Sequence, residues 1–575
     1  MNITQIKKKK PKDLNNIAND IRKFLIESVS KTGGHIGANL STVELTIALH
    51  KVFKSPRDKF IFDTGHQGYT HKILTGRKKN FNTLNQFKGM SRFLSRTESK
   101  HDIIDASHAG TAISIASGIA INNFKKKNFF TIAIVGDGTM VEGMNFEALN
   151  FASEKTKNLI IILNDNEMAI DKSVGGFKHL TTGKGWKKKS KNFFKGLNYD
   201  YLAVDDGHDI KKIVNALNLA KKSRKTCIVH LKTTKGYGLP FAKSHKYKMH
   251  FSVPFDPRTG EGANPTIKGK TMSMVAAREI NKLLGVNNKI CVITPATPYA
   301  SHLEEIDKKY HSRIIDVGMA EQHAVGYCCG LAVAGLKPIL CIQSTFLQRA
   351  YDQLIHDVSY MSSDVLILSS RSGFSGLDSA THHGVFDLSY LNTVPNLQIY
   401  YPNSEKQLKS ILKLKTLKSN KGPSIVLLPY DPIEKGLNFD NNNILKTKST
   451  KNNLIIFCLL NTLGIANQIK YSNLRKKYSS IKVFCLNQIK PLNSNNLNKI
   501  KKNYKNSFFL SIEENILSGG LGSILKNNLN IDNNKFLNIG IKDRFIDAGN
   551  KHDCQKLSKI NAKSIIDKLY KWTKN

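Results

Sequence analysis

Two short polar runs, which contain glycines and oxygen-bearing side chains, each follow directly after an apolar, strand-like segment. Gly-Asp-Gly at 136–138 ends the run TIAIVGDG, and Asn-Asp-Asn at 164–166 ends the next such run, with a helical stretch between them. One βαβ unit therefore brings the carboxylate of Asp137 and the amide oxygen of Asn166 to adjacent strand ends. Such oxygens bind a hard cation, and Gly138 would admit a phosphate close to the backbone. Gly-Asp-Gly alone is a common turn, but the second cluster at this distance favours a magnesium–diphosphate site.

Several histidines lie in glycine-containing loops, where their near-neutral pKa would suit proton transfer around a small substrate. A single histidine is more commonly a structural residue, but several in separate loops favour a site assembled from strand ends. No pair has the spacing of a helical zinc site and no Cys lies in the same loops, so a transition-metal site is not expected. The histidines concerned are His35, His66, His250, His323, His382 and His383.

Glu321, in the run GMAEQHAV, follows a predicted strand and opens a predicted helix rich in small apolar residues. Two interpretations stay open from the residues alone. An acid at a helix start is stabilised by the helix dipole. A semi-buried carboxylate could instead share a proton with a cofactor nitrogen, because desolvation would raise its pKa.

Arg349 and Arg371 stand out because Arg is scarce in this chain, and both lie just past predicted strands. Two guanidinium groups at strand ends could hold a substrate phosphate through paired hydrogen bonds. The alternative is a structural ion pair, for example between Arg349 and Asp352.

Apolar runs alternate with helical periods, which predicts an α/β protein with parallel sheets. A Lys- and Gly-rich stretch at 172–198 is interpreted as a loop or lid, and 256–265 as a linker. An Asn-rich break at 440–453 precedes a third α/β region. The clearest predicted strands are 131–138, 158–164, 313–318, 337–343 and 364–370.

The chain has 575 residues with 40% hydrophobic and 23% charged residues, ordinary values for a protein of several globular domains. Its formal net charge of +43 comes mostly from Lys spread along the whole sequence. Because Lys lacks the planar fork of Arg, nucleic acid is not the expected partner. Neither a secretory segment nor a membrane span is evident, so a cytoplasmic protein without membrane attachment is expected. Lys7 to Lys10 are predicted to form a disordered arm.

Eight cysteines form no C-x-x-C motif and lie mostly in apolar runs. This pattern predicts buried free thiols in a reducing compartment rather than a disulfide or zinc framework. The neighbouring Cys328 and Cys329 are expected to be core residues.

Seven motifs together resemble the 1-deoxy-D-xylulose-5-phosphate synthase family, which are thiamine-diphosphate enzymes of the transketolase-like group. The resemblance covers nearly the whole chain, from about residue 12 to 570. The motifs are DTGHQGYTHKILTGR (63–77), GDGTMVEGMNFEALN (136–150), NDNEMAI (164–170), GMAEQHAV (318–325), STFLQRAYDQLIHDV (344–358), SATHHGVFDLSYL (379–391) and DRFIDAG (543–549).

The resemblance implies a three-domain, transketolase-like α/β architecture and a homodimer. The implied domains are a diphosphate- and magnesium-binding domain at 1–262, a pyrimidine-binding domain at 263–440 and a C-terminal domain at 441–575. The implied reaction is decarboxylation of pyruvate and condensation of its two-carbon unit with glyceraldehyde 3-phosphate, with thiamine diphosphate and Mg²⁺ as cofactors.

The resemblance also assigns roles to individual residues. Glu321 would hydrogen-bond the aminopyrimidine ring of the cofactor. The metal ligands would be Asp137, Asn166 and the carbonyl of Met168. The pocket histidines would be His35, His66, His250 and His382. Further cofactor contacts would come from Gly136, Gly138, Thr139 and Lys235. The acceptor substrate would meet Arg349, Arg371, Asp378 and His382.

The sequence departs from the family pattern in four places. Gln343 stands where the family has a tyrosine, Tyr430 replaces an expected phosphate-binding arginine, and Lys243 replaces an acid. The segment between NDNEMAI and the VDDGHD run at 204–209 is shorter than expected. Two alternative functions are therefore kept: a related transketolase-like or 2-oxoacid decarboxylating enzyme with another acceptor, and a degenerate, non-catalytic polyanion-binding protein.

Overall fold

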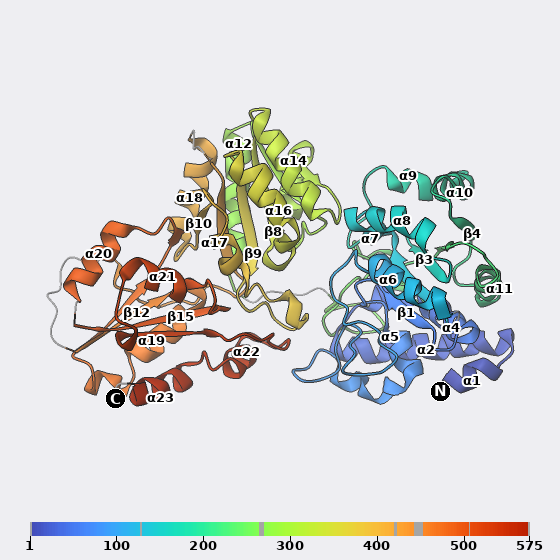
Figure 1. Cartoon of the computed structure of the whole chain (residues 1–575), viewed down its shortest axis with the longest axis horizontal. Helices are drawn as coiled ribbons and strands as arrows, with labels where there is room; N and C mark the ends of the chain where they lie inside the picture. Colours follow the sequence, from blue (N-terminus) through green and yellow to red (C-terminus); the bar gives the residue numbers. More distant parts are fainter. Residues whose placement is uncertain are drawn as a thin grey trace. The chain divides into compact units, whose positions relative to one another are not determined.

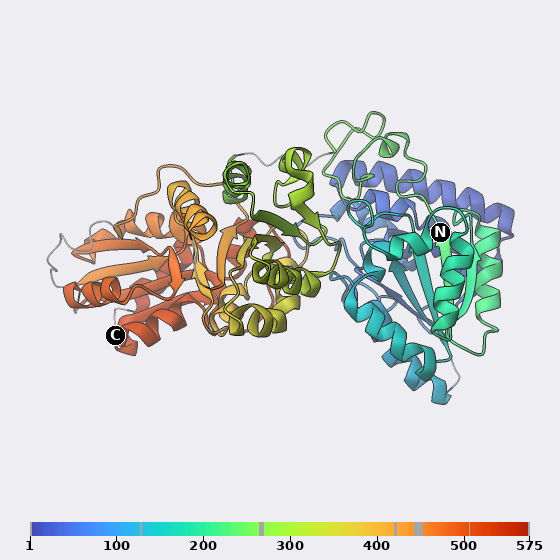
Figure 2. The same ribbon diagram turned by 90° about the horizontal axis from the view of Figure 1, so that it is seen from above.

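The computed structural model describes residues 3–126, 129–263, 269–418, 422–441, 452–504 and 506–572. The chain divides into two compact units. The first unit comprises Met1–Thr266 with Val317–Ala320, and the second comprises Ile267–Asp316 with Glu321–Asn575. Figure 1 labels the elements, and Figure 2 shows the same ribbon from above.

The first unit is built on a five-stranded sheet in which every neighbouring pair is parallel. Strand β3 reads LIIILND and is buried along its whole length, as expected of a strand covered on both faces. The sheet order is β1 (Lys59–Phe62), β2 (Thr131–Gly136), β3 (Leu159–Asp165), β5 (Cys227–Lys232) and β4 (Asp200–Val204).

Alternate residues of these strands enter two separate cores, because successive side chains of a strand point to opposite faces. Ile132 and Ile134 of β2 join a core built with helices α2 (Pro11–Thr32), α4 (Val43–Val52) and α11 (Ile210–Ala220). Ala133 and Val135 join a core built with α6 (Ala112–Lys126) and α8 (Gly143–Lys155). Helices therefore cover both faces of the sheet (Figure 2). The shorter helices of this unit are α1 (Ile3–Lys8), α3 (Ile36–Leu40), α5 (Tyr69–Lys72), α7 (Asp137–Met140), α9 (Phe177–Thr181) and α10 (Trp186–Gly196).

The second unit contains two sheets. The larger has the order β14 (Gln488–Lys490), β10 (Gln398–Tyr400), β11 (Ser424–Pro429), β9 (Leu366–Ser372), β8 (Lys337–Gln343), β6 (Ile290–Thr294) and β7 (Ile314–Asp316). All its pairs are parallel except that of β14 with β10. The smaller sheet is parallel throughout, with the order β13 (Ser480–Cys485), β12 (Asn453–Cys458), β15 (Phe508–Ile516) and β16 (Phe536–Ile541).

Helices flank both of these sheets. Those of the larger sheet are α12 (Met272–Val286), α13 (Glu304–Tyr310), α14 (Glu321–Val333), α15 (Ser344–Leu347), α16 (Tyr351–Gln353), α17 (Asp387–Asn392) and α18 (Glu405–Leu417). Those that follow along the chain are α19 (Leu463–Lys470), α20 (Ser494–Asn503), α21 (Leu521–Leu529), α22 (Lys551–Leu557) and α23 (Ala562–Trp572). Among the described helices, none combines the length and apolar character needed to cross a bilayer.

The predicted α/β class with parallel sheets is confirmed, and the eight cysteines are buried free thiols as predicted. The predicted disordered arm is wrong: α1 extends to Lys8, and Lys7 Nζ donates to the carbonyl oxygens of Lys51 at 3.0 Å and Phe53 at 2.6 Å. The stretch 172–198 is also not a plain loop, because it contains α9 and α10. Residues 442–451 of the predicted Asn-rich break lie outside the described residues.

The two predicted domain boundaries stay predictions. The first, at 262, lies close to the end of the first compact unit at Thr266. The second, at 440, separates the strands of the two sheets in the second unit apart from β14, which follows this boundary in sequence yet pairs with β10.

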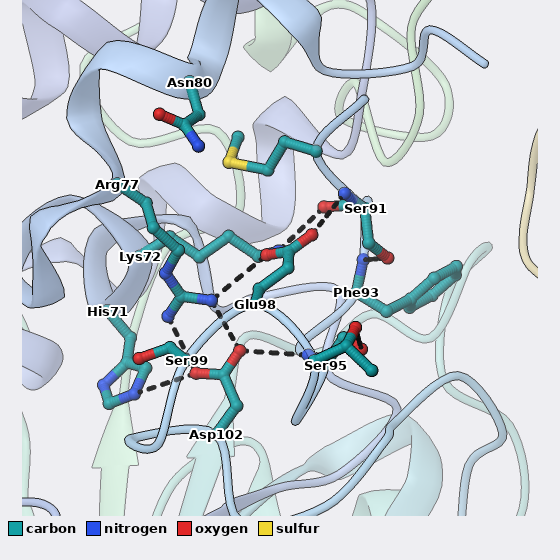
Figure 3. Close-up of polar contacts among 12 residues, drawn as sticks. His71, Lys72, Arg77, Asn80, Ser91, Phe93, Ser95, Glu98, Ser99 and Asp102 are labelled. Atoms are coloured by element: carbon teal, nitrogen blue, oxygen red, sulfur yellow. Dashed lines mark hydrogen bonds and ion pairs between the residues drawn. The ribbon is translucent and has the colours of Figure 1, made fainter. Parts of the chain in front are cut away.

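A buried network of ion pairs fixes the loop at 91–102 in the first unit (Figure 3). Arg77 donates to both oxygens of Asp102, at 2.6 and 2.7 Å, and Lys72 Nζ lies 2.5 Å from Glu98 Oε2. The same two carboxylates accept backbone N–H groups of the loop, Glu98 from Ser91 and Asp102 from Ser95. Breaking one partner of a buried pair costs ~3–5 kcal/mol, so this network anchors the loop.

Two stacked histidines extend the network into the core. His71 Nε2 lies 3.4 Å from Asp102 Oδ1, and His71 Nδ1 lies 2.9 Å from His50 Nε2. Burial lowers the pKa of both imidazoles from the ordinary value, so both are neutral in the folded protein at pH 7. The carboxylate favours a proton on His71 Nε2, which leaves Nδ1 to accept a hydrogen bond from His50.

We predict that lowering the pH from 7 to 5 reduces the free energy of unfolding. Unfolded histidines bind protons below a pKa of about 6.5, whereas burial shifts proton binding by His50 and His71 to lower pH, so stability rises with pH across this window. The His50→Gln variant keeps an N–H donor for His71 and cannot titrate. Its stability should therefore depend less steeply on pH, by up to about 1.4 kcal/mol per pH unit. Urea denaturation at pH 7 and pH 5 measures both slopes, and equal slopes would contradict the assignment.

Candidate functional site

Four of the predicted site residues of the first unit follow neighbouring parallel strands. His66 comes after β1, Asp137 directly after β2, Asn166 directly after β3 and Lys235 after β5. The carboxyl ends of parallel strands share one edge of a sheet, which is where ligands bind in α/β proteins. The topology therefore brings these side chains to one edge.

Asp137 and Asn166 form an oxygen-rich pair at this edge. Asp137 is 3% exposed; its Oδ1 accepts the N–H of Asn166 at 3.2 Å, and its Oδ2 accepts the hydroxyl of Ser173 at 2.6 Å. Asn166 Oδ1 is buried and accepts no hydrogen bond from the described residues. Burial, and then the charge of Asp165, raise the pKa of Asp137 to about 7. A divalent cation could bind the side-chain oxygens of both residues, so these residues fit a magnesium ion.

Asp165, between these two residues, is already paired. Its Oδ2 lies 2.9 Å from His230 Nε2 and 2.8 Å from Lys232 Nζ. Its charge therefore serves a buried ion pair, and it acts on Asp137 only as a neighbouring negative charge.

Lys235 places a buried amine beside the same pair. Its Nζ donates to the carbonyl of Ala169 at 2.6 Å. Burial lowers its pKa to about 7, although the charges of Asp137 and Asp171 act in the opposite direction. A diphosphate group next to this amine would favour its protonated form.

Gly138 permits a close approach between two segments of the protein itself. A Cβ at this position would lie 2.5 Å from Ala169 Cα and 2.6 Å from Ala169 Cβ. The close approach that the glycine permits is therefore to the loop after β3, which carries Met168. That loop turns through Glu167 at φ 64° and closes with an isolated bridge between Met168 and Lys172. Phosphate contact at Gly138 stays a prediction.

Three predicted pocket histidines form one cluster. The ring centroids of His35, His66 and His250 lie 5.3 to 5.5 Å apart pairwise. Paired backbone hydrogen bonds between Gly34 and Ser252, at 2.8 and 2.9 Å, hold the segments of His35 and His250 together.

Burial keeps two of these histidines neutral. It lowers the pKa of His66 to about 3 and that of His250 well below its ordinary value. The Nδ1 atoms of both are buried and without a hydrogen-bond partner among the described residues. A neutral imidazole has one donor and one acceptor, so these groups can hydrogen-bond a ligand without carrying charge.

Glu321 is the first residue of α14 in the second unit and is 6% exposed. Its Oε2 accepts no hydrogen bond from the described residues, and Arg349 Nη1 lies 3.6 Å away, beyond hydrogen-bond range. Burial raises the pKa of Glu321 despite the Arg349 charge. The semi-buried interpretation of this carboxylate therefore fits the structure, and its neighbour Arg349 faces it.

Arg371 lies at the end of β9 with φ 61°, a left-handed conformation that is strained for a residue with a side chain. Its Nη1 lies 2.8 Å from Asp378 Oδ2, and its guanidinium carbon lies 5.0 Å from the ring centroid of Tyr430. His382 follows in the same loop, with Nδ1 2.7 Å from Ser379 Oγ. The predicted acceptor residues Arg371, Asp378 and His382 thus belong to one strand end.

Comparison with known proteins settles the family. A family model described as 1-deoxy-D-xylulose-5-phosphate synthase matches residues 1–185, and one described as transketolase, pyrimidine binding domain, matches residues 268–432. The 1-deoxy-D-xylulose-5-phosphate synthase of Listeria monocytogenes serotype 4b is 38% identical over 555 residues, covering 93% of this chain and 90% of the relative. That of Clostridium acetobutylicum is 36% identical over 619 residues, covering 99% and 98%. The chain belongs to the 1-deoxy-D-xylulose-5-phosphate synthase family.

The predicted resemblance and its function are thereby confirmed, and the chain is a thiamine-diphosphate-dependent transferase of the transketolase group. Among solved structures, the transketolase from Leishmania mexicana aligns over 98% of this chain at 15% identity with a TM-score of 0.46.

The predicted site residues of this synthase divide between the two units, and their individual roles stay predictions. The first unit holds His35, His66, Gly136, Asp137, Gly138, Thr139, Asn166, Met168, Lys235 and His250. The second holds Glu321, Arg349, Arg371, Asp378 and His382. His323 is exposed on α14 beside Tyr327 and joins neither group. His383 follows His382, and its Nδ1 accepts the N–H of Ser375 in the same loop.

Two residues beside the predicted ones were not found from the sequence. Ser173 bonds Asp137 from a Lys-rich stretch without any motif, and Ser379 bonds His382. Ser173 gives no local signal, whereas Ser379 opens the SATHHG run and could have been included. Gln343, a departure from the family pattern, is 2% exposed, and its Oε1 has no hydrogen-bond partner among the described residues.

We predict that Gly138→Ala displaces the loop after β3 and weakens magnesium-dependent activity by at least about tenfold, because the new methyl group would meet backbone atoms that cannot move aside alone. Gly143→Ala is the matched control: this glycine begins α8 and has nothing within 4 Å of a built Cβ. The control should keep full activity. Titration of activity with Mg²⁺ separates the two, and equal Mg²⁺ dependence would contradict the role of Gly138.

Proposed function

We propose that this chain converts pyruvate and D-glyceraldehyde 3-phosphate into 1-deoxy-D-xylulose 5-phosphate and CO₂, with thiamine diphosphate held through Mg²⁺. The observation that carries the proposal is the buried Oδ1 of Asn166, which has no hydrogen-bond partner among the described residues and belongs to the residue next to the Asp137 carboxylate. The product is a precursor for isoprenoid, thiamine and pyridoxal phosphate synthesis.

The cation and the diphosphate are assigned to the sheet edge of the first unit. Asp137, Asn166 and the carbonyl of Met168 would supply the magnesium oxygens, and Lys235 would neutralise charge on the diphosphate. Ser173 would keep Asp137 oriented through its 2.6 Å hydrogen bond. Thiamine diphosphate, when bound, would supply the carbanion chemistry that removes CO₂ from pyruvate.

Glu321 is assigned the proton-sharing role. Its buried Oε2 carries no hydrogen bond from the described residues, and its raised pKa makes a shared proton with a ring nitrogen favourable. Arg349 would keep the carboxyl oriented from 3.6 Å.

The clustered histidines are assigned to the substrate oxygens. His35, His66 and His250 would donate and accept hydrogen bonds there, and His66 and His250, which burial keeps neutral, would do so without attracting a counter-ion. His382, fixed by Ser379, would do the same at the acceptor, and Arg371 would bind the acceptor phosphate.

A transketolase-like enzyme with another acceptor is the second candidate. Arg371 is already paired with Asp378 and stacked on Tyr430, so the positive charge offered to a phosphate dianion is reduced. The acceptor is the feature on which the two candidates differ.

We further propose a homodimer. Helices α6 and α8 of the first unit expose apolar side chains that a second copy could cover. These are Ile115, Ile121, Phe146 and Phe151.

A purified-protein assay with Mg²⁺, thiamine diphosphate and pyruvate, with and without D-glyceraldehyde 3-phosphate, tests the reaction. We expect CO₂ release to depend on the phosphorylated acceptor and to stop when the cation is chelated. Pyruvate consumption of equal rate without the acceptor would favour the second candidate.

We predict that Glu321→Gln lowers kcat by at least about a hundredfold while fold and oligomeric state persist, because the amide cannot share the carboxyl proton. Glu405→Gln is the control, since Glu405 also opens a helix, α18, but is partly exposed and paired with Lys270. The control should lose only a little stability. Activity of the Glu321 variant near that of the wild type would refute the proton-sharing role.

A further inference from the structure

Glu514 connects the smaller sheet of the second unit to the loop that follows β9. It lies on β15 and is 3% exposed. Its Oε2 accepts the N–H of Phe374 at 3.3 Å and the Asn461 side-chain amide at 3.1 Å, while its Oε1 accepts the Gln555 amide at 2.8 Å. Three donors thus surround one carboxylate.

Glu514 packs so closely against Gly373 of this loop that a side chain at position 373 would not fit. Gly373 has φ 83°, and a Cβ there would lie 2.7 Å from Glu514 Oε2 and 2.6 Å from Asn461 Nδ2. The backbone of Gly373 is also bonded in both directions to Gly384, at 3.0 and 2.8 Å. The start and the end of the loop at 373–384 are therefore held together against Glu514.

That loop carries the acceptor residues of the proposed site. Arg371 stands two residues before Gly373, and Asp378 and His382 lie within the loop. Two further bonds tie it to the C-terminal part of the chain: Ile516 N–H donates to Val385 at 2.8 Å, and His383 Nε2 lies 3.3 Å from the carbonyl of Asp547.

The Tyr430 side of the Arg371 guanidinium lies next in sequence to an ion pair of the C-terminal part of the chain. Lys551, on α22, lies 3.3 Å from Asp431, the residue after Tyr430. The Lys551 charge also lowers the pKa of Glu514, whereas burial raises it. Glu514 and Lys551 thus contact the chain next to both partners of the stacked pair formed by Arg371 and Tyr430.

We propose that Glu514 is a positioning residue that sets the geometry of Arg371 and Tyr430 and thereby the binding of the acceptor phosphate. The inference rests on the proposed function, because it takes Arg371 as the group that meets the phosphate. Glu514 itself touches neither substrate.

Glu513 is a matched control. It is the neighbouring residue of β15, so its side chain points to the opposite face, and it is equally buried. Its carboxylate accepts the N–H groups of Leu521 and Gly522 at the start of α21, at 2.5 and 3.0 Å. Its contacts thus support α21 rather than the loop at 373–384.

The experiment compares the full-length wild type with Glu514→Gln, Lys551→Met and Glu513→Gln. Glutamine at 514 can accept hydrogen bonds at only one of its two terminal atoms, so at least one of the three donors loses its partner. Lys551 is partly exposed, which makes its variant the milder one. For each protein, melting temperature, kcat and the KM values for pyruvate and D-glyceraldehyde 3-phosphate are measured, with Arg371→Ala as the reference for a lost phosphate contact.

We expect Glu514→Gln to raise the KM of D-glyceraldehyde 3-phosphate about tenfold with the pyruvate KM nearly unchanged. Lys551→Met should shift the ratio of the D-glyceraldehyde 3-phosphate KM to the pyruvate KM in the same direction. Glu513→Gln should lower the melting temperature without changing this ratio. The proposal would be overturned if the ratio of the two KM values were the same in the Glu514, Lys551 and Glu513 variants. If Glu514→Gln does not fold, an unchanged ratio in Lys551→Met would overturn it. Failure of the wild type to use the phosphorylated acceptor would instead overturn the proposed function.

Discussion

Desolvation of titratable side chains at the carboxyl ends of parallel strands governs both groups of site residues. Asp137 and Lys235 in the first unit and Glu321 in the second are each nine-tenths or more removed from water. Burial shifts the pKa of each toward its neutral form. An isolated buried charge is costly, so groups of this kind persist where a ligand or counter-charge repays the cost. The sheets and loops around these three side chains hold them in place at the strand ends.

Backbone hydrogen bonding supplies most of that holding. The segments of His35 and His250 are joined through Gly34 and Ser252, and the loop after β9 is closed by Gly373 and Gly384. Glycine is needed at 373 because a side chain would meet Glu514 and Asn461. The loops that carry the chemistry are therefore fixed by main-chain contacts and by buried carboxylates, while the sheets supply the common edge.

The sequence was informative wherever hydrophobic periodicity and a motif coincided. The run TIAIVGDG predicted both β2 and the position of Asp137 at its end, and the predicted strand 337–343 coincides with β8. Periodicity failed at 172–198, where Lys-rich helices bury few apolar residues, and at Lys7, whose ammonium is held by main-chain carbonyls. Contacts such as those of Ser173 with Asp137 and of Glu514 with Phe374 join segments far apart in sequence. No local pattern encodes such pairs, because they arise only when separate strand ends meet.

Strand β14 has a consequence for where this protein could be shortened. Although it belongs to the last third of the chain, it completes the border of the larger sheet by lying antiparallel to β10, and Lys490 Nζ caps the carbonyls of Asn392 and Val394 at 2.8 and 2.6 Å. A chain ending before β14 would leave unpaired backbone amide groups along β10. Unpaired edges of this kind pair with other chains and lead to aggregation. The C-terminal part of the chain thus covers an edge of the larger sheet that would otherwise be open to pairing with other chains.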